Sequence, residues 1–427
     1  MKKTSPWGWI PTLYFAQGLP YVIVVTLSVV MYKRLGISNT DIALYTSWLY
    51  LPWVIKPLWS PVVDILKRKR WWIVVMQLLI GGGLGGIALT LPGPEPFRYS
   101  LALMWLLAFS SATHDIAADG FYMLGLSEKQ QAFFVGWRNT FYRAAVLTGQ
   151  GLIVMVAGLL EKRYSATLPE ATAIPKAWSV IFVILSGLFL LLFLYHHFML
   201  PRPEQDKPTS EEGKLRNFGD TFISFFQKKG VLPVLVFILF FRFAESQLVK
   251  IASPFLLDET EKGGIGLDTA EVGLVYGTIG MIALVVGGIA GGMAIARKGL
   301  NYWIWWMVVA MNIPNIAYLY LAFAQPSQLW IISSCVAIEQ LGYGFGFTAL
   351  TVVMLLFSAG KRQTAHYAIC TGFMAIGMML PGMASGWIQE TIGYRLFFAW
   401  VMLCTIPSFL VVYLVRRRTT GDDPHLK

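Results

Sequence analysis

Charged residues are scarce in this chain of 427 residues: Asp, Glu, Lys and Arg together make up only 13% of it, whereas apolar residues make up 56%. Soluble domains carry about twice that share of charge, so the composition predicts an integral membrane protein. Cysteine is also rare, and its three positions fall inside separate apolar runs without metal-ligand spacing, which favours plain packing roles. The sequence therefore predicts no bound metal.

Signatures of several other protein classes are missing. The formal net charge of +11 is not gathered in a basic block with interleaved polar residues, so we expect no nucleic-acid partner. The chain has no glycine-rich phosphate loop, no metal-ligand set and no large soluble segment that could hold a cofactor. Embedded aspartates also occur in intramembrane proteases, but no second aspartate motif of matching kind is present. We therefore predict that the protein is not an enzyme and uses no cofactor.

Long apolar runs, by contrast, are abundant. Lys2 and Lys3 precede an apolar stretch of more than about 20 residues, which is enough to span a bilayer, so we expect no cleavable signal peptide. Twelve such runs follow one another, six on each side of a polar segment at 201–229 that is rich in Pro, Glu and Lys. The expected spans are 7–32, 42–63, 71–91, 99–122, 133–160, 177–200, 231–257, 270–296, 302–324, 329–357, 364–389 and 395–415.

Six spans on each side of one charged connection are the layout of a transporter built from two parallel repeats. The sequence thus predicts an all-α membrane protein with 12 transmembrane helices in two six-helix bundles. We expect an N-terminal bundle at 1–200, a cytoplasmic linker at 201–229 and a C-terminal bundle at 230–427. Placing both termini in the cytoplasm puts most of the loop Lys and Arg on the cytoplasmic side, as the positive-inside rule requires.

Two carboxylates stand at the end of the fourth apolar run. Asp115 and Asp119 are four residues apart, so they lie one turn apart on the same helix face. A charge at bilayer depth costs at least ~2.5 kcal/mol, and such a cost is rarely accepted twice without a polar cavity or a partner cation. The next span supplies Arg138 and Arg143. We therefore expect a polar pathway through a helical bundle.

The short connection between the fourth and fifth spans makes these two helices antiparallel neighbours, which sets the pairing between them. Counting from that turn, Asp119 lies level with Arg138 or Asn139. Asp115 lies level with Arg143. We predict that Arg143 pairs with Asp115 in the empty protein and turns to a carboxylate of the substrate in the loaded protein.

The loop after the second span contains an acid, Asp64, followed by a basic run at 67–70. It partly resembles the signature of the major facilitator superfamily, although Ser60 stands where that signature has a glycine. An acid at a helix end that faces basic residues can latch two helices in one conformation and release them in the other. We expect Asp64 and Arg68 to form such a latch, and the alternative is that 67–70 is only a positive-inside anchor.

Several segments scattered along the whole chain resemble a narrower family by their order and spacing. They are 15–20 (FAQGLP), 56–61 (KPLWSP), 112–119 (ATHDIAAD), Tyr142 and Arg143 with Gly149 and Gly151, 242–245 (RFAE), 270–273 (AEVG), 339–346 (EQLGYGFG) and 364–368 (TAHYA). Together they resemble the AmpG-type muropeptide permeases of the major facilitator superfamily. The departures are His114 in place of an amide, Glu245 in place of an aspartate, and a charged outer loop at 258–262.

This resemblance implies a major facilitator fold and the uptake of cell-wall turnover products, anhydromuropeptides of the GlcNAc-anhydroMurNAc type, for peptidoglycan recycling. The implied mechanism is proton symport by alternating access in the inner membrane, and we expect a monomer. Symport also agrees with the fifth span, which has glycines but no Gly-Pro kink of the kind found in antiporters. The alternatives are a permease for another sugar, an amino sugar or a coenzyme-A thioester, and a transporter-like sensor that binds without translocating.

A muropeptide carries sugar hydroxyls, amides and carboxylates, so its site needs aromatic faces, amides and at least one cation. In the second span Lys56 lies between Trp53 and Trp59, where it either pairs with a carboxylate or snorkels to the interface. It is also the candidate after Arg143 for the substrate carboxylate. The residues expected to bind substrate are Tyr14, Gln17 and Tyr21 on one face of the first helix, and Trp53, Lys56, Asp115, Asp119, Asn139, Tyr142, Arg143 and Gln340.

Proton coupling requires a buried acid, and the candidates are Asp115, Asp119, Glu245 and Glu339. Glu245 follows Arg242 by three residues, so the two can pair along one helix face and be purely structural. Glu339 has no cation nearby in its own span, which leaves a protonated carboxyl or a partner on another helix, and we rank it first. His114 is a relay candidate because it adjoins an aspartate, whereas His366 is expected at the membrane interface.

Overall fold

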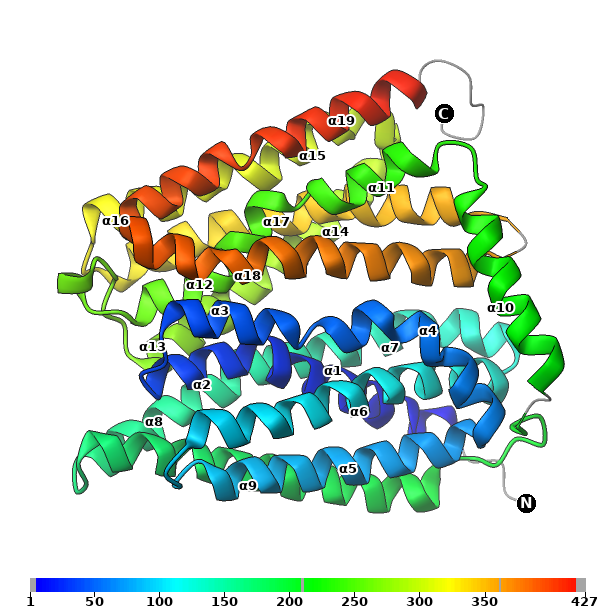
Figure 1. The fold of residues 1–427 in the computed structure, drawn as a ribbon, viewed down its shortest axis with the longest axis horizontal. Coiled ribbons are helices and arrows are strands. Elements are labelled where there is room, and N and C mark those ends of the chain that lie inside the picture. Colours follow the sequence, from blue (N-terminus) through cyan, green and yellow to red (C-terminus); the bar gives the residue numbers. More distant parts are fainter. Residues whose placement is uncertain (1–4, 209–210, 361, 420–427) are drawn as a thin grey trace. The chain divides into compact units, whose positions relative to one another are not determined.

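The computed structural model describes residues 5–208, 211–360 and 362–419, and within these ranges every regular element is a helix. The chain divides into two compact units (Figure 1). Unit 1 comprises Met1–Ile37 and Ile55–Phe218. Unit 2 comprises Ser38–Val54 and Gly219–Lys427, so the second predicted span is shared between them.

Unit 1 consists of long helices with short connections. Its first span continues without a break because a π-helical turn at Ile23–Leu27 joins α1 to α2, and a second π-helical turn at Thr148–Ile153 joins α7 to α8. The helices are α1 (Ile10–Val22), α2 (Ser28–Arg34), the larger part of α4 (Leu51–Leu66), α5 (Lys69–Thr90), α6 (Pro96–Gly125), α7 (Glu128–Leu147), α8 (Val154–Ser165) and α9 (Glu170–Met199).

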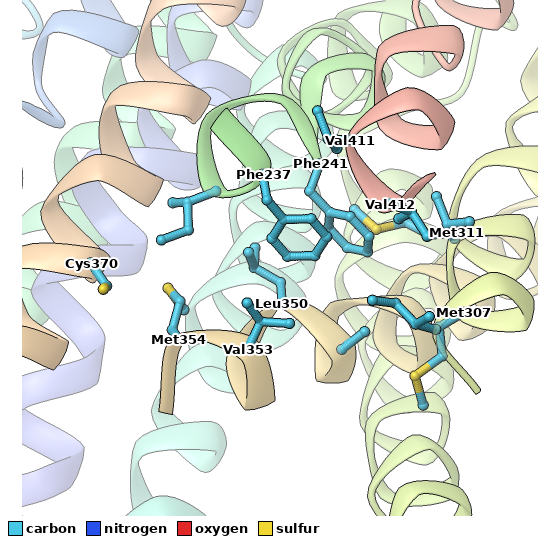
Figure 2. Packing of buried hydrophobic residues seen from close by; sticks show 14 of the residues in the cluster. Phe237, Phe241, Met307, Met311, Leu350, Val353, Met354, Cys370, Val411 and Val412 are labelled. Atoms are coloured by element: carbon cyan, nitrogen blue, oxygen red, sulfur yellow. The ribbon is translucent and has the colours of Figure 1, made fainter. Parts of the chain in front are cut away.

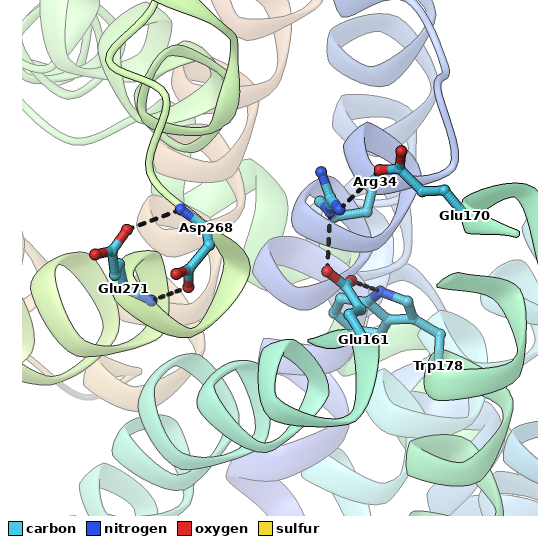
Figure 3. A network of polar contacts seen from close by, with 6 residues as sticks. All are labelled: Arg34, Glu161, Glu170, Trp178, Asp268 and Glu271. Carbon is cyan, nitrogen blue, oxygen red and sulfur yellow. Dashed lines mark hydrogen bonds and ion pairs between the residues drawn. The ribbon is translucent and has the colours of Figure 1, made fainter. Parts of the chain in front are cut away.

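Unit 2 contains the remaining helices, and a capping box begins one of them. The Asp268 side chain accepts from the Glu271 backbone N–H at 2.9 Å, and the Glu271 side chain accepts from the Asp268 N–H at 3.0 Å (Figure 3). The helices are α3 (Asn39–Trp48), α10 (Glu211–Phe226, which starts in unit 1), α11 (Val231–Phe240), α12 (Phe243–Leu257), α13 (Thr269–Val272), α14 (Met281–Lys298), α15 (Leu300–Asn312), α16 (Ile316–Ala324), α17 (Leu329–Ser358), α18 (Gln363–Leu403) and α19 (Ile406–Thr419).

The predicted all-α membrane fold is confirmed, although the helices divide differently from the predicted spans. Ten helical stretches in the described part of the chain are long and apolar enough to cross a membrane. The predicted span 42–63 is split into α3 and α4 by a turn at Leu49 and Tyr50. The last two predicted spans run together within α18 and α19, where Gly393 adopts a positive φ of 75° and kinks the path.

Residues 38–54 belong to unit 2 because α3 lies against α18. The Asn39 side-chain amide donates to Gln389 Oε1 at 2.6 Å and to the Tyr394 hydroxyl at 2.9 Å. A Cβ at Gly386 would stand only 2.0 Å from the Asn39 carbonyl oxygen, so the two backbones touch at this point. Such close approach at a small residue is typical of helix pairs in membranes.

A large apolar core holds unit 2 together. The rings of Phe237 and Phe241 on α11 lie 4.7 Å apart between centroids, and they pack against Met311 of α15, Leu350 of α17 and Val412 of α19 (Figure 2). These side chains are 1% exposed or less. Dense packing of this kind makes the core sensitive to changes of volume.

The crossing of α14 and α17 depends on glycine, which yields a first prediction. A Cβ at Gly344 would lie 2.0 Å from the Leu284 carbonyl oxygen, so Gly344→Ala should force the helices apart and cost about 1–3 kcal/mol of stability. The measurement is the thermal unfolding midpoint of the purified protein in detergent. Gly292→Ala on α14 is the matched control, because no atom lies within 4 Å of its Cβ position, and it should be neutral or slightly stabilising. Equal midpoints for both variants would contradict the close crossing.

Candidate functional site

Asp115 on α6 forms an ion pair with a lysine of unit 1. Lys56 Nζ, on α4, lies 3.6 Å from Asp115 Oδ2, and Asp115 is 8% exposed. A carboxylate and an ammonium group at this depth offset part of each other's desolvation cost. Of the two interpretations of Lys56 that the sequence left open, the structure supports pairing with a carboxylate.

Asp119, one turn further along α6, holds a second cation. Arg138 Nη2 of α7 lies 3.4 Å from Asp119 Oδ1, so the predicted level match between Asp119 and Arg138 is confirmed. The guanidinium carbon also lies 4.9 Å from the ring centre of Tyr14 and 5.0 Å from that of Tyr122. One arginine is thus oriented by a carboxylate and by two aromatic faces.

The predicted pairing of Asp115 with Arg143 is wrong for this structure. Arg143 is exposed and has no ion pair among the described residues, while Lys56 lies beside Asp115 instead. The error lies in the choice of helix face: Asn139 and Arg143, four residues apart, are both exposed, whereas Arg138 is partly buried and faces α6. Arg143 therefore remains accessible to a ligand.

Polar atoms on α1 lie close to this pair of acids. Tyr14 is 2% exposed and Gln17 is 7% exposed. The Tyr14 hydroxyl and Gln17 Oε1 have no hydrogen-bond partner within the described structure, which is unusual for buried polar atoms. Tyr21 and Tyr142 are half-buried, and Trp53, in the part of α4 that belongs to unit 2, is also half-buried.

A chain of hydrogen bonds through unit 1 was not predicted from the sequence. Thr12 Oγ1 lies 2.9 Å from His196 Nε2, His196 Nδ1 lies 3.0 Å from Gln77 Oε1, and Gln77 Nε2 lies 3.1 Å from His114 Nε2. Because an amide oxygen only accepts and its NH₂ only donates, Gln77 assigns the proton to His196 Nδ1 and makes His114 Nε2 the acceptor. The sequence contains a signal that could have predicted these hydrogen bonds, because Gln77 and His196 are polar residues inside apolar runs. This chain of hydrogen bonds fixes the orientation of the His114 side chain, which adjoins Asp115 in the sequence.

The acids of unit 2 lie in a different environment. Glu339 on α17 is 0% exposed, and its Oε2 accepts from Gln340 Nε2 at 2.9 Å. Glu245 on α12 is 1% exposed, and neither of its carboxyl oxygens has a hydrogen-bond partner within the described structure. The two carboxyl groups are near enough to interact electrostatically, and the buried Tyr276 and Tyr318, which sequence analysis missed, interact with both. An unpaired carboxylate is costly at such a site.

Arg242 and Glu245 do not form the expected ion pair among the described residues, although Arg242 still acts on Glu245 electrostatically. Arg242 immediately precedes α12 and has non-helical angles, φ −108° and ψ 23°, so the rule for residues three apart on a helix does not apply to it. Its guanidinium instead donates to the Tyr343 hydroxyl and lies 4.9 Å from the Tyr343 ring centre and 5.0 Å from that of Phe347.

Two further cationic or titratable side chains of unit 2 are buried. Lys250 is 3% exposed, and its ammonium group donates to Thr46 Oγ1 at 2.9 Å and lies 5.1 Å from the Tyr50 ring centre. His366, expected at the membrane interface, is 5% exposed and its Nε2 lies 3.0 Å from Ser224 Oγ on α10.

The Asp64 side chain lies outside the described part of the chain, so the structure does not bear on the predicted latch with Arg68, which is exposed. Among the described residues, no group of three His, Cys, Asp or Glu is placed to hold a metal ion.

A multi-pass helical protein with paired charges buried in its spans has the fold and the site of a membrane transporter. The profile of the Major Facilitator Superfamily matches residues 12–365, so the chain belongs to this superfamily. It is therefore a secondary transporter with a small-molecule substrate, and not an enzyme.

Curated relatives cover nearly the whole chain at low identity. An anhydromuropeptide permease of Escherichia coli (strain K12) is 23% identical over 95% of this chain and 79% of its own length. A putative transporter AmpG 4 of Rickettsia felis is 25% identical over 95% of both chains. An uncharacterised protein of Haemophilus influenzae is 25% identical over 94% of this chain and 92% of its own.

Solved structures share the fold. A D-xylose–proton symporter matches with a TM-score of 0.70 at 12% identity, covering 96% of each chain. An inward-facing, unoccupied bacterial homologue of the human lysosomal transporter Spinster matches with a TM-score of 0.69 at 13% identity, again covering 96% of each chain. These similarities establish the major facilitator fold and leave the substrate open.

The pair of Lys56 and Asp115 gives a second prediction. Lys56→Gln and Asp115→Asn should each lower the thermal unfolding midpoint. The loss in free energy of unfolding should be less than the roughly 3–5 kcal/mol of a fully buried pair, because the Lys56 side chain is 29% exposed. The double variant should unfold closer to the wild type, since no stranded charge remains. Arg143→Gln is the control and should leave the midpoint unchanged. Strictly additive losses in the double variant would show that the two side chains do not stabilise each other.

Proposed function

We propose that this transporter imports anhydromuropeptides by proton symport. The proposal is based mainly on four side chains of unit 1. Asp119 pairs with Arg138, and the Arg138 guanidinium lies over the rings of Tyr14 and Tyr122. Charged and aromatic side chains held in fixed positions make a polar environment that suits a ligand with hydroxyls, amides and carboxylates. The unpartnered Tyr14 hydroxyl and Gln17 oxygen add hydrogen-bonding groups for hydroxyls and amides of the ligand.

The relatives support the same substrate class. Two of them are named an anhydromuropeptide permease and a putative transporter AmpG 4, and each aligns with 95% of this chain. The sequence segments that resemble AmpG-type permeases include the stretch that contains Asp115 and Asp119. Both the relatives and the chemistry of the site therefore support this substrate class.

In this proposal Arg143 binds a carboxylate of the muropeptide. It is exposed and has no ion pair within the described structure, so no ion pair among the described residues must break before it binds the ligand. Lys56 holds Asp115 in the structure and becomes the second candidate. Trp53, Tyr21, Asn139, Tyr142 and Gln340 remain proposed contacts, in line with the sequence analysis.

The coupling proton is proposed to bind in unit 2. Asp115 and Asp119 have cations within 3.6 Å and 3.4 Å, whereas Glu245 and Glu339 have no ion pair among the described residues. Arg242 acts on Glu245 electrostatically without forming an ion pair, and Glu339 has no cation in its own helix. The burial cost of a carboxylate without an ion pair changes most when a proton arrives or leaves. Glu339 ranks first because it is fully buried and has no cation in its own helix.

The positive-inside bias supports a position in the cytoplasmic membrane with both termini in the cytoplasm. We also propose that the chain works as a monomer whose two six-helix bundles alternate around the linker 201–229, with Asp64 and Arg68 as a conformational latch.

Transport in proteoliposomes tests the proposed function and is the third prediction. With an imposed pH gradient, labelled anhydromuropeptide should accumulate, free sugars should not compete, and a protonophore should abolish the accumulation. Accumulation that survives collapse of both the pH and voltage gradients would exclude proton symport. Ligand binding without counterflow would indicate a sensor, and preferred uptake of free sugars would indicate another sugar permease.

A fourth prediction separates coupling from binding. Glu339→Gln and Glu245→Gln each keep the shape of the side chain and remove its titration, so the variant at the coupling site should lose uphill uptake and retain counterflow, which needs no net proton movement. Glu259→Gln, in an exposed ion pair with Lys262 at 3.1 Å, is the matched control and should retain both activities. If both Glu245 and Glu339 variants keep uphill uptake, neither glutamate carries the coupling proton.

A further inference from the structure

A basic pocket in unit 1 is lined by residues other than the acids and tyrosines described above. It has a volume of about 730 Å³ and lies where α4 ends, α5 begins and α9 ends. Its walls come from the α4–α5 loop and from the segment at 202–208 that follows α9. We propose that this pocket binds the phosphate of an anionic membrane phospholipid.

The pocket carries an excess of positive charge. Lys67, Arg68, Arg70 and Arg202 line it, against one carboxylate, Asp206. That carboxylate is already occupied, because its two oxygens accept the backbone N–H groups of Lys69 at 2.8 Å and of Arg70 at 3.1 Å. Asp206 therefore caps α5, and its charge is offset by the N-terminal end of that helix.

Two of the four cations, Lys67 and Arg202, are available for an anion, and Arg68 is available in the conformation in which its proposed latch with Asp64 is open. The Arg70 guanidinium donates to the carbonyl oxygens of His197 and, at 3.3 Å, of Leu200, so it caps the end of α9. Lys67, Arg68 and Arg202 have no ion pair within the described part of the chain. Charge-assisted hydrogen bonds from several such groups are the usual way in which proteins hold a phosphate.

The apolar side of the pocket decides between a lipid and a free anion. Trp71 is 42% exposed and Leu66 is 55% exposed, and Val74 and Phe193 continue the apolar wall along α5 and α9. A tryptophan beside lysines and arginines at the end of a span is typical of the membrane interface. Cations next to an apolar wall fit a phosphate with acyl chains attached, and basic pockets between transmembrane helices bind anionic head groups.

A second pocket of unit 1 allows the charge of the basic pocket to be compared with that of a pocket of similar size. It has a similar volume, about 840 Å³, and it contains Arg34. Arg34 is neutralised there by Glu161 at 3.0 Å and Glu170 at 3.4 Å (Figure 3). The two pockets are therefore similar in size, and the pocket at Arg68 differs in its charge: four cations line it, whereas Arg34 and Lys176 line the second pocket.

Binding of the full-length protein in detergent tests the proposal. Dioctanoyl phosphatidylglycerol should bind saturably in native mass spectrometry and in titration calorimetry, and dioctanoyl phosphatidylcholine should bind much more weakly. Arg68→Gln and Arg202→Gln should each weaken phosphatidylglycerol binding about fivefold. Lys176→Gln, in the second pocket, is the matched control and should leave the affinity unchanged.

Three outcomes would overturn the proposal. Equal affinity for the two lipids would show that the charge is not recognised. Unchanged affinity in both Arg68→Gln and Arg202→Gln, with unfolding midpoints like that of the wild type, would show that the lipid binds elsewhere. Lys67→Gln replaces either variant if it does not fold. Competition by millimolar inorganic phosphate as strong as by phosphatidylglycerol would identify a site for free anions.

Discussion

The cost of a buried charge is the constraint on which the functional part of this protein depends. Unit 1 meets it by pairing: Lys56 lies beside Asp115, and Arg138 lies beside Asp119. Unit 2 buries two carboxyl groups, Glu245 and Glu339, without an ion pair among the described residues. Desolvating an unpaired charge costs far more than desolvating an ion pair. A proton that binds in unit 2 therefore removes the cost of a carboxylate without an ion pair, whereas a proton that binds to Asp115 or Asp119 in unit 1 breaks an ion pair.

This difference supports a division of labour between the units. In unit 1 the paired charges hold fixed positions near aromatic rings and unpartnered polar atoms, which is a suitable environment for recognising a polar ligand. In unit 2 two carboxyl groups interact electrostatically in an apolar interior, which is a suitable environment for binding a proton. The basic pocket at Arg68 lies in unit 1, and Lys67, Arg68 and Arg202 in its wall have no ion pair among the described residues.

Much of the fold followed from the sequence because the length of an apolar run is a strong signal for a membrane helix. The break between α3 and α4 escaped prediction, since Leu49 and Tyr50 are as apolar as their neighbours. Pairing between adjacent helices could be predicted, as for Asp119 and Arg138, but the partner of Asp115 comes from α4, which is distant in sequence. The predicted ion pair of Arg242 with Glu245 was wrong because the backbone of Arg242 is not helical. Sequence spacing carries no information about such local geometry.

The central claim, that unit 2 binds the coupling proton and unit 1 binds the ligand, is tested most directly by counting protons. A pH-sensitive dye in weakly buffered detergent solution would report protons taken up or released when anhydromuropeptide is added to the purified protein. The account predicts a stoichiometric signal in the wild type and in Glu259→Gln, and its loss in the double variant Glu245→Gln/Glu339→Gln, which should still bind the ligand. A full signal in that double variant, together with loss of the signal in Asp115→Asn, would contradict the account and move the proton to unit 1.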